Sequence, residues 1–167
     1  MADNRTRHLG GLALALALLA LDQITKWAAL QALDPYQPHA LTPFFNLVLV
    51  WNRGVSFGMF ASVGQHGPWL LTALAAAIGA FVIVWLYRET RTVPRLALWM
   101  VLAGAVGNSI DRLRFGAVVD FLDFHAFGYH WPAFNVADSS IVVGACLILL
   151  DSLVLSQTRT KLGRGQQ

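Results

Sequence analysis

The sequence predicts an all-α membrane protein with four transmembrane helices and a small extracytoplasmic loop region that contains β-structure. Hydrophobic residues make up 56% of the 167-residue chain, and charged residues only 13%. The mean hydropathy is +0.55. A soluble domain of this size needs far more polar surface to cover its core, so the composition indicates a bilayer protein. We expect one domain over residues 1–167.

Four apolar stretches, extended through their polar flanks, approach the roughly 20 residues that a helix needs to cross a bilayer. The expected transmembrane helices cover residues 9–30, 68–87, 96–115 and 137–156. The outer loops between them cover residues 31–67 and 116–136. The first stretch has the length of the apolar part of a signal peptide. It lacks an A-x-A cleavage site and three further apolar segments follow it, which favours a polytopic protein.

Basic residues lie mainly on one side of these segments, which the positive-inside rule assigns to the cytoplasm. That side carries Arg5, Arg7, Arg88, Arg91, Arg95, Arg159, Lys161 and Arg164. The other side carries only Lys26, Arg53, Arg112 and Arg114. Both chain ends are therefore expected in the cytoplasm. Orientation in the membrane also explains these basic tracts better than phosphate binding, so we expect no nucleic-acid partner.

The first outer loop contains a candidate strand at residues 47–51, followed by a turn at Asn52, Arg53 and Gly54. Val and Trp favour a strand, and the Asn and Gly favour the turn. Phe57 and Phe60 resume the apolar character after it. Aromatic side chains here are as compatible with anchoring at the membrane surface as with substrate contact.

Three of the four predicted helices become polar at the same, outer end. These polar residues are Asp22 and Lys26, then Asn108, Asp111 and Arg112, then Asn135 and Asp138. Charged groups at membrane depth are costly and are kept mainly when paired or functional, so the convergence predicts one buried polar site. Asp22 and Lys26 are spaced i, i+4, which predicts an ion pair with a structural role.

Three aspartates near this end are candidates for chemistry. Asp138 lies in the first turn of a helix, where free backbone N–H groups favour its ionised form, although helix capping alone would explain it. Asp120 and Asp123 lie in the second outer loop, and the residue pattern does not choose between them. An acid held there against apolar neighbours, without such donors, would have a raised pKa. Two carboxylates separated in this way can share acid and base roles around one water.

Metal chemistry is disfavoured by the residue types present. The single cysteine, Cys146, lies in an apolar run, and the five histidines form no H-E-x-x-H motif. A serine peptidase is an alternative, with Ser56, Ser109, Ser139 or Ser140 as nucleophile, but no His is expected on a helix opposite a candidate serine, where it could activate the hydroxyl. A proton-coupled transporter or a purely structural membrane subunit are the further alternatives.

Five short motifs occur in an order that resembles the lipoprotein signal peptidases, the signal peptidase II family. They are D-Q-I-T-K at 22–26, N-R-G-V-S-F at 52–57, G-A-V-G-N-S-I-D-R at 104–112, V-V-D-F at 118–121 and F-N-V-A-D at 134–138. The resemblance covers most of the chain. It implies an aspartic endopeptidase of the bacterial inner membrane, without metal or cofactor, whose active site lies near the periplasmic face.

By this resemblance, Asp120 and Asp138 form the catalytic pair, and Asp120 is chosen over Asp123. The residues implied to line or brace the site are Asn52, Gly54, Asn108, Arg112 and Asn135. Asp22, Lys26 and Asp111 are expected to support it. The implied substrates are diacylglyceryl-modified prolipoproteins, cut before the lipidated cysteine. Membrane lipids are the other expected partners, and we expect a monomer.

Overall fold

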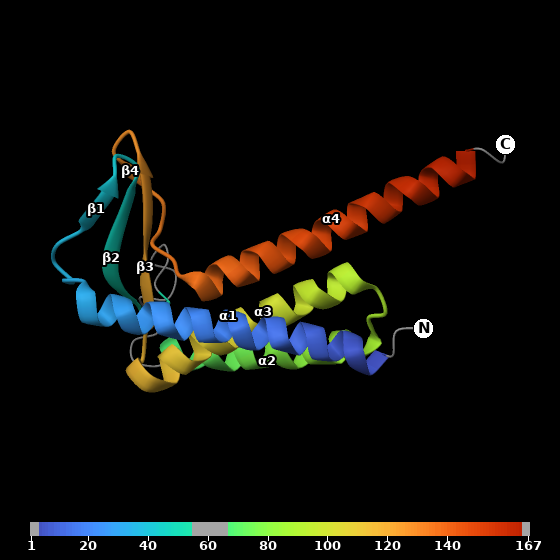
Figure 1. Cartoon of the computed structure of the whole chain (residues 1–167), viewed down its shortest axis with the longest axis horizontal. Coiled ribbons are helices and arrows are strands. Elements are labelled where there is room, and N and C mark those ends of the chain that lie inside the picture. The colour runs from blue at the N-terminus through green and yellow to red at the C-terminus, as the bar shows by residue number, and fades with distance from the viewer. Residues whose placement is uncertain (1–3, 55–66, 165–167) are drawn as a thin grey trace.

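The computed structural model describes residues 4–54 and 67–164, which form four helices and a small sheet (Figure 1). The helices are α1 (Asn4–Ala32), α2 (Gly67–Arg88), α3 (Thr92–Phe115) and α4 (Val136–Arg164). All four are long and apolar enough to cross a membrane. The expected four-helix architecture is therefore confirmed. Ser56, Phe57 and Phe60 lie outside the described residues.

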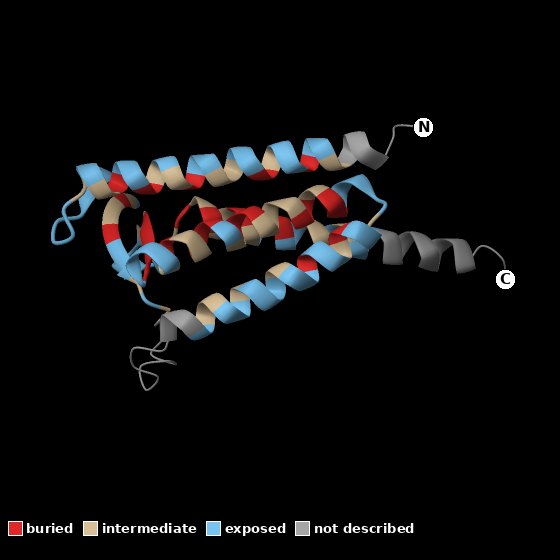
Figure 2. Ribbon diagram, turned by 90° about the horizontal axis from the view of Figure 1, so that it is seen from below, coloured by how far each residue is buried: buried red, intermediate tan, exposed pale blue. Residues whose placement is uncertain are grey.

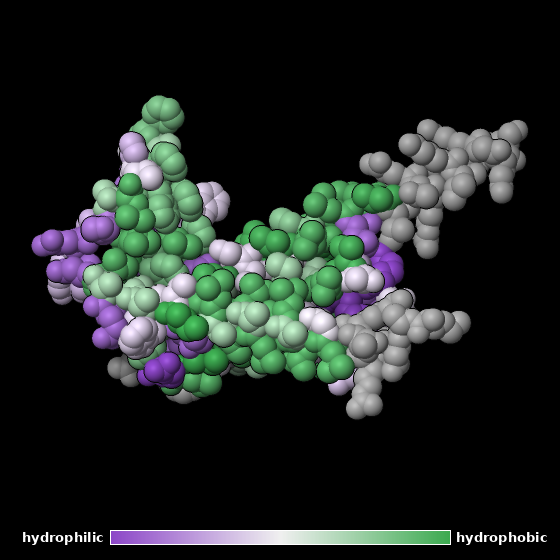
Figure 3. Space-filling view, viewed as in Figure 1, coloured by the Kyte–Doolittle hydropathy of each residue, from purple (hydrophilic) through white to green (hydrophobic). Residues whose placement is uncertain are grey.

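Helix α3 is the centre of the bundle and packs against the other three helices. Small residues allow this close approach: a Cβ on Gly144 of α4 would lie 2.7 Å from the Ala97 carbonyl oxygen of α3. Buried residues on α1 recur at intervals of three, four or seven positions, which is one or two helical turns, on the side that faces α3 (Figure 2). Large apolar residues such as Leu16, Phe81 and Val154 point outward. Hydrophobic side chains accordingly cover the flank of the bundle (Figure 3), which suits a lipid environment.

The sheet lies at the end of the bundle where α1 and α3 finish and α4 begins (Figure 1). Its four strands are antiparallel and run in the order β1 (His39–Thr42), β2 (Phe45–Asn52), β3 (Val118–Ala126) and β4 (Tyr129–His130). The predicted strand at 47–51 is confirmed as part of β2. The turn after it is also confirmed, since Gly54 has a φ of +87°.

The segment that carries Asp120 and Asp123 was expected as loop and is instead strand β3. Its first four residues are all buried, so no alternation of polar and apolar residues marks it in the sequence. Asp120 lies opposite Val50 of β2, and Asp123 lies opposite Asn46. Successive side chains of a strand point to opposite faces, so these two aspartates do not face the same side of the sheet.

Candidate active site

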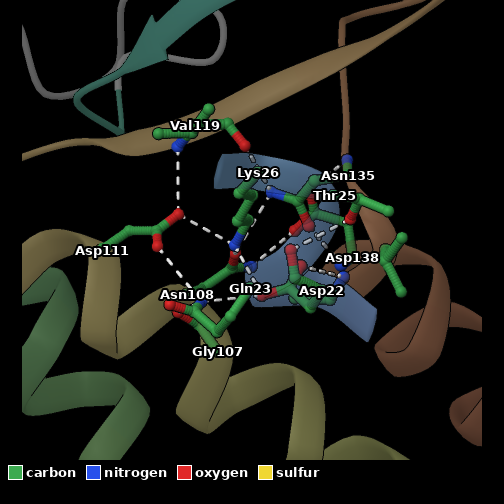
Figure 4. Close-up of polar contacts among 12 residues, drawn as sticks. Asp22, Gln23, Thr25, Lys26, Gly107, Asn108, Asp111, Val119, Asn135 and Asp138 are labelled. Atoms are coloured by element: carbon green, nitrogen blue, oxygen red, sulfur yellow. Dashed lines mark hydrogen bonds and ion pairs between the residues drawn. The ribbon is translucent and has the colours of Figure 1, made fainter. Parts of the chain in front are cut away.

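A buried ammonium group lies at the centre of the polar end of the bundle. Lys26 Nζ of α1 is 2.9 Å from Asp22 Oδ2 and 2.8 Å from Asp111 Oδ2 of α3 (Figure 4). It also donates a hydrogen bond of 3.0 Å to Asn108 Oδ1. The predicted pair between Asp22 and Lys26 is confirmed, and Asp111 joins it. One cation with two carboxylates leaves the group with one negative charge in excess.

The two carboxylates extend this cluster to the other elements. Asp22 Oδ1 accepts a 2.9 Å bond from the backbone N–H of Ala137, in the first turn of α4. Asp111 Oδ2 accepts a 3.1 Å bond from the Val119 N–H of β3. Gln23 Nε2 donates to Asp22 and Asp111 at 3.1 and 3.3 Å. Gln23 was not among the expected site residues; only its place beside Asp22 in the sequence indicates its role. The cluster thus connects α1, α3, α4 and β3.

Asp120 is almost fully buried, with 1% of its surface exposed. Asn52 Nδ2 donates to Asp120 Oδ2 at 2.9 Å, and Asn135 Nδ2 donates to Oδ1 at 2.6 Å. Both donors are side-chain amides rather than the backbone N–H groups of a helix start. Burial and the nearby charge of Asp138 nevertheless outweigh the two amides and raise the pKa of Asp120 to about 7.

Asp138 forms a reciprocal cap at the start of α4 together with Asn135. The Asp138 N–H donates to Asn135 Oδ1 at 2.9 Å, and the Asn135 N–H donates to Asp138 Oδ2 at 3.2 Å. This is the geometry of a capping box, with Asn135 as the N-cap residue. Asn108 Nδ2 donates a further bond of 2.7 Å to Asp138 Oδ1. The capping role expected for Asp138 therefore exists, and the carboxylate remains part of the site.

Two amide side chains link the lysine cluster to the two acids. Asn108 Oδ1 accepts bonds from Lys26 and from Asn135 Nδ2, which fixes its Nδ2 toward Asp138. Asn135 Nδ2 also donates to the Val119 carbonyl at 3.2 Å while it reaches Asp120. Asp120 and Asp138 are thus both hydrogen-bonded to Asn135, from a strand on one side and a helix start on the other.

Gly54 and Arg112 are hydrogen-bonded to two of the asparagines that hold the acids. The Gly54 N–H donates to Asn52 Oδ1 at 2.8 Å, which leaves the Asn52 Nδ2 directed to Asp120. Arg112 Nη1 donates a long bond of 3.5 Å to the Asn108 carbonyl. Its Nε is buried and has no partner within the described part of the chain. The guanidinium therefore retains donor capacity beside the acids.

Two clefts meet at the acids and share Asn52, Pro132 and Ala133. The cleft on the Asp120 side has a volume of about 370 Å³ and is also lined by Val50, Trp51 and Arg53. The cleft on the Asp138 side has a volume of about 560 Å³ and is also lined by Trp131, Phe134, Ser139, Val142 and Val143. Val142 and Val143 are exposed on α4, so the second cleft extends to the lipid-facing surface of that helix.

The alternative serine nucleophiles are engaged elsewhere. Ser109, Ser139 and Ser140 each donate their hydroxyl to a backbone carbonyl one helical turn earlier, at 2.7 to 2.9 Å. Among residues 4–54 and 67–164, no group of three or more His, Cys, Asp or Glu side chains is arranged to hold a metal ion. Asp123 lies away from the two clefts, where it is bound by Asn46 and His130.

A family model, related sequences and a solved structure each match most of this chain. The family described as Signal peptidase (SPase) II matches residues 14–154. A lipoprotein signal peptidase of Burkholderia mallei is 45% identical over 161 residues, covering 92% of this chain and 96% of the relative. One from Cupriavidus pinatubonensis is 43% identical, covering 91% and 87%. A solved bacterial membrane enzyme aligns with a TM-score of 0.79 at 28% identity, covering 89% of this chain and 90% of the other.

Proposed function

The chain belongs to the signal peptidase II family, and we propose that it removes the signal peptide from diacylglyceryl-modified prolipoproteins, cutting before the lipidated cysteine. We assign it to the aspartic peptidases, with Asp120 and Asp138 as the catalytic pair and no metal or cofactor. The observation that carries this assignment is that both acids accept hydrogen bonds from one residue, Asn135, at the junction of two clefts: Asp120 from its side-chain Nδ2 and Asp138 from its backbone N–H.

The mechanism is general acid and base catalysis on a water between the two carboxyl groups. Asp138, at the helix start, begins ionised and takes a proton from water as its oxygen attacks the scissile carbonyl carbon. Asp120, whose pKa is raised to about 7, begins protonated and hydrogen-bonds to the carbonyl oxygen. The C–N bond then breaks, and a proton passes to the leaving amine. The two acids titrate as a coupled pair, so each apparent pKa belongs to both.

The surrounding amides and the guanidinium have supporting roles in this proposal. Asn52 and Asn135 hold the Asp120 carboxyl group, and Asn108 holds that of Asp138. The free donor capacity of Arg112 suits the substrate backbone or the charge that develops on the carbonyl oxygen. Gly54 fixes Asn52.

The cleft beside α4 suits a substrate that stays attached to the membrane. Val142 and Val143 connect it to the lipid-facing surface, so acyl chains can remain in the bilayer while the peptide reaches the acids. The distribution of basic residues supports a site near the periplasmic face of the inner membrane, with both termini in the cytoplasm. We propose that the protein acts as a monomer.

Cleavage of a purified lipidated precursor tests the catalytic pair. Asp120→Asn and Asp138→Asn should each lower kcat by roughly 10²–10⁴-fold while the purified protein keeps a cooperative thermal transition. Ser139→Ala is the matched control on the same helix turn and should turn over at the normal rate. Appreciable activity in either Asn variant would refute the pair, and inhibition by a metal chelator would refute the metal-free mechanism.

A further inference from the structure

A second polar cluster lies on the sheet, centred on Asp123. His130 Nδ1 of β4 is 2.9 Å from each oxygen of the Asp123 carboxylate. Asn46 Nδ2 of β2 donates to Asp123 Oδ2 at 2.9 Å. The Asp123 side chain is 8% exposed and that of His130 is 56% exposed. One buried carboxylate therefore connects the strands on both sides of β3.

His130 is the last residue of β4, directly before the segment that forms the shared wall of the two clefts. β3 and β4 meet in a two-residue turn at Phe127 and Gly128, with φ of 52° and 81°. After His130, the Trp131 N–H donates to the Phe124 carbonyl at 2.8 Å. The chain rejoins β3 at Phe134, which forms an isolated bridge with Leu122.

Residues 131–133, which we call the wall, lie between these two backbone contacts to β3 and add few backbone hydrogen bonds of their own. Pro132 has no N–H to donate, and Trp131, Pro132 and Ala133 point into or border the cleft beside Asp138. Pro132 and Ala133 also border the cleft beside Asp120. β4 therefore leads directly into the residues that border both clefts at the point where they meet.

We infer that Asp123 is a positioning residue for substrate binding, which through His130 holds the wall formed by residues 131–133 against the two clefts. This inference rests on the proposed peptidase function. Asp123 contacts neither acid, and it acts on the substrate only through the wall.

The charge state of Asp123 agrees with this role. Burial tends to raise its pKa, but the bonds from His130 and Asn46 outweigh burial, and the pKa lies below its ordinary value. The titratable groups that act on this carboxylate are His130 from β4 and His125 from β3 itself, while β2 contributes only the neutral amide of Asn46. The His125 ring stacks on His130 with centroids 4.9 Å apart. The carboxylate is therefore ionised throughout the neutral range.

Steady-state cleavage of a lipidated precursor by the full chain tests the inference. Asp123→Asn and His130→Asn should each raise KM by roughly three- to tenfold, as expected for loss of a charge-assisted hydrogen bond with a half-exposed partner, with kcat within about twofold. The double variant should raise KM no further than either single variant, because the two residues act as one unit. His39→Asn, an exposed histidine on β1, is the matched control and should leave KM unchanged.

Hydrogen exchange without substrate separates this inference from the proposed function. Deuterium uptake at residues 129–134 should rise in Asp123→Asn and His130→Asn but not in His39→Asn, whether or not the protein cleaves the precursor. An unchanged KM in both single variants would overturn the inference, even if exchange rises. So would KM effects that multiply in the double variant. Failure of the native protein to cleave any lipidated precursor would refute the proposed function instead.

Discussion

Replacement of Asn135 by alanine and, in a second variant, by serine separates its helix-capping bond from its bond to Asp120. Its Oδ1 caps α4 by accepting the Asp138 N–H at 2.9 Å, and its Nδ2 holds Asp120 at 2.6 Å. Asn135→Ala removes both interactions. Asn135→Ser keeps an N-cap oxygen but has no amide that can reach Asp120, so it removes only the second.

The expected magnitudes follow from these contacts. Loss of the N-cap should lower the free energy of unfolding by about 0.5–2 kcal/mol in the alanine variant, and the serine variant should recover most of this. Asp120 begins protonated in the proposed mechanism, and a hydrogen bond between neutral groups contributes about 0.5–1.5 kcal/mol. Loss of the bond from Asn135 should therefore lower kcat by roughly 2- to 12-fold in both variants, since about 1.4 kcal/mol corresponds to a factor of ten.

The pH dependence of kcat tests the same hydrogen bond independently, because the direction in which the profile moves can be predicted. The bond from Asn135 stabilises ionised Asp120 and so lowers its pKa, which burial and the charge of Asp138 raise to about 7. Removal of the amide should raise this pKa further. If Asp120 is the proton carrier, it stays protonated to higher pH, and the alkaline limb of the kcat profile should move upward in both variants.

Thermal unfolding in detergent and cleavage of a lipidated precursor across pH measure these effects. The result that would refute the reasoning is an Asn135→Ser variant with normal kcat, because the bridge to Asp120 would then be irrelevant to turnover. A downward movement of the alkaline limb would contradict the assignment of Asp120 as the proton carrier.

Two further predictions concern stability. Lys26→Met leaves the buried carboxylates of Asp22 and Asp111 without their cation, and should lower the free energy of unfolding by about 3–5 kcal/mol in a denaturant titration; a loss under about 1 kcal/mol would contradict the buried cluster. Gly107→Ala places a Cβ 2.6 Å from Asp22 Oδ2, and the overpacking should cost about 1–3 kcal/mol by thermal unfolding. Gly10→Ala on exposed α1 is its control, since a Cβ there meets nothing within 4 Å and should be neutral or slightly stabilising.

Features that depend on short stretches of sequence were predictable. The four helices follow from length and hydropathy, the pair of Asp22 and Lys26 follows from its i, i+4 spacing, and the turn after β2 follows from Asn52 and Gly54. Each of these patterns involves neighbours in the chain, where helix and turn geometry alone decide the contact.

Features that depend on long-range packing were not predictable from the residues alone. Strand β3 is buried from Val118 to Phe121, so this part of its sequence lacks the alternation that marks a half-exposed strand. The bond between Asp22 and Ala137 joins residues 115 positions apart. The orientation of the Asn108 amide depends on donors from two other elements. Asp120 and Asp123 lie on opposite faces of the sheet, and the sequence alone does not show which of the two faces the clefts.

The i, i+4 pair on α1 also bears on how the protein enters the bilayer. Because the chain is made from its N-terminus, α1 is inserted before α3 and α4 exist, and its two ionised side chains lie near one end of the helix. Their mutual contact makes this end of α1 electrically neutral, which lowers the cost of bringing it to membrane depth. Asp111 then arrives with α3 and meets a lysine already in place. The first turn of α4 finds in Asp22 an acceptor for the Ala137 N–H, so the last helix to be made completes the site.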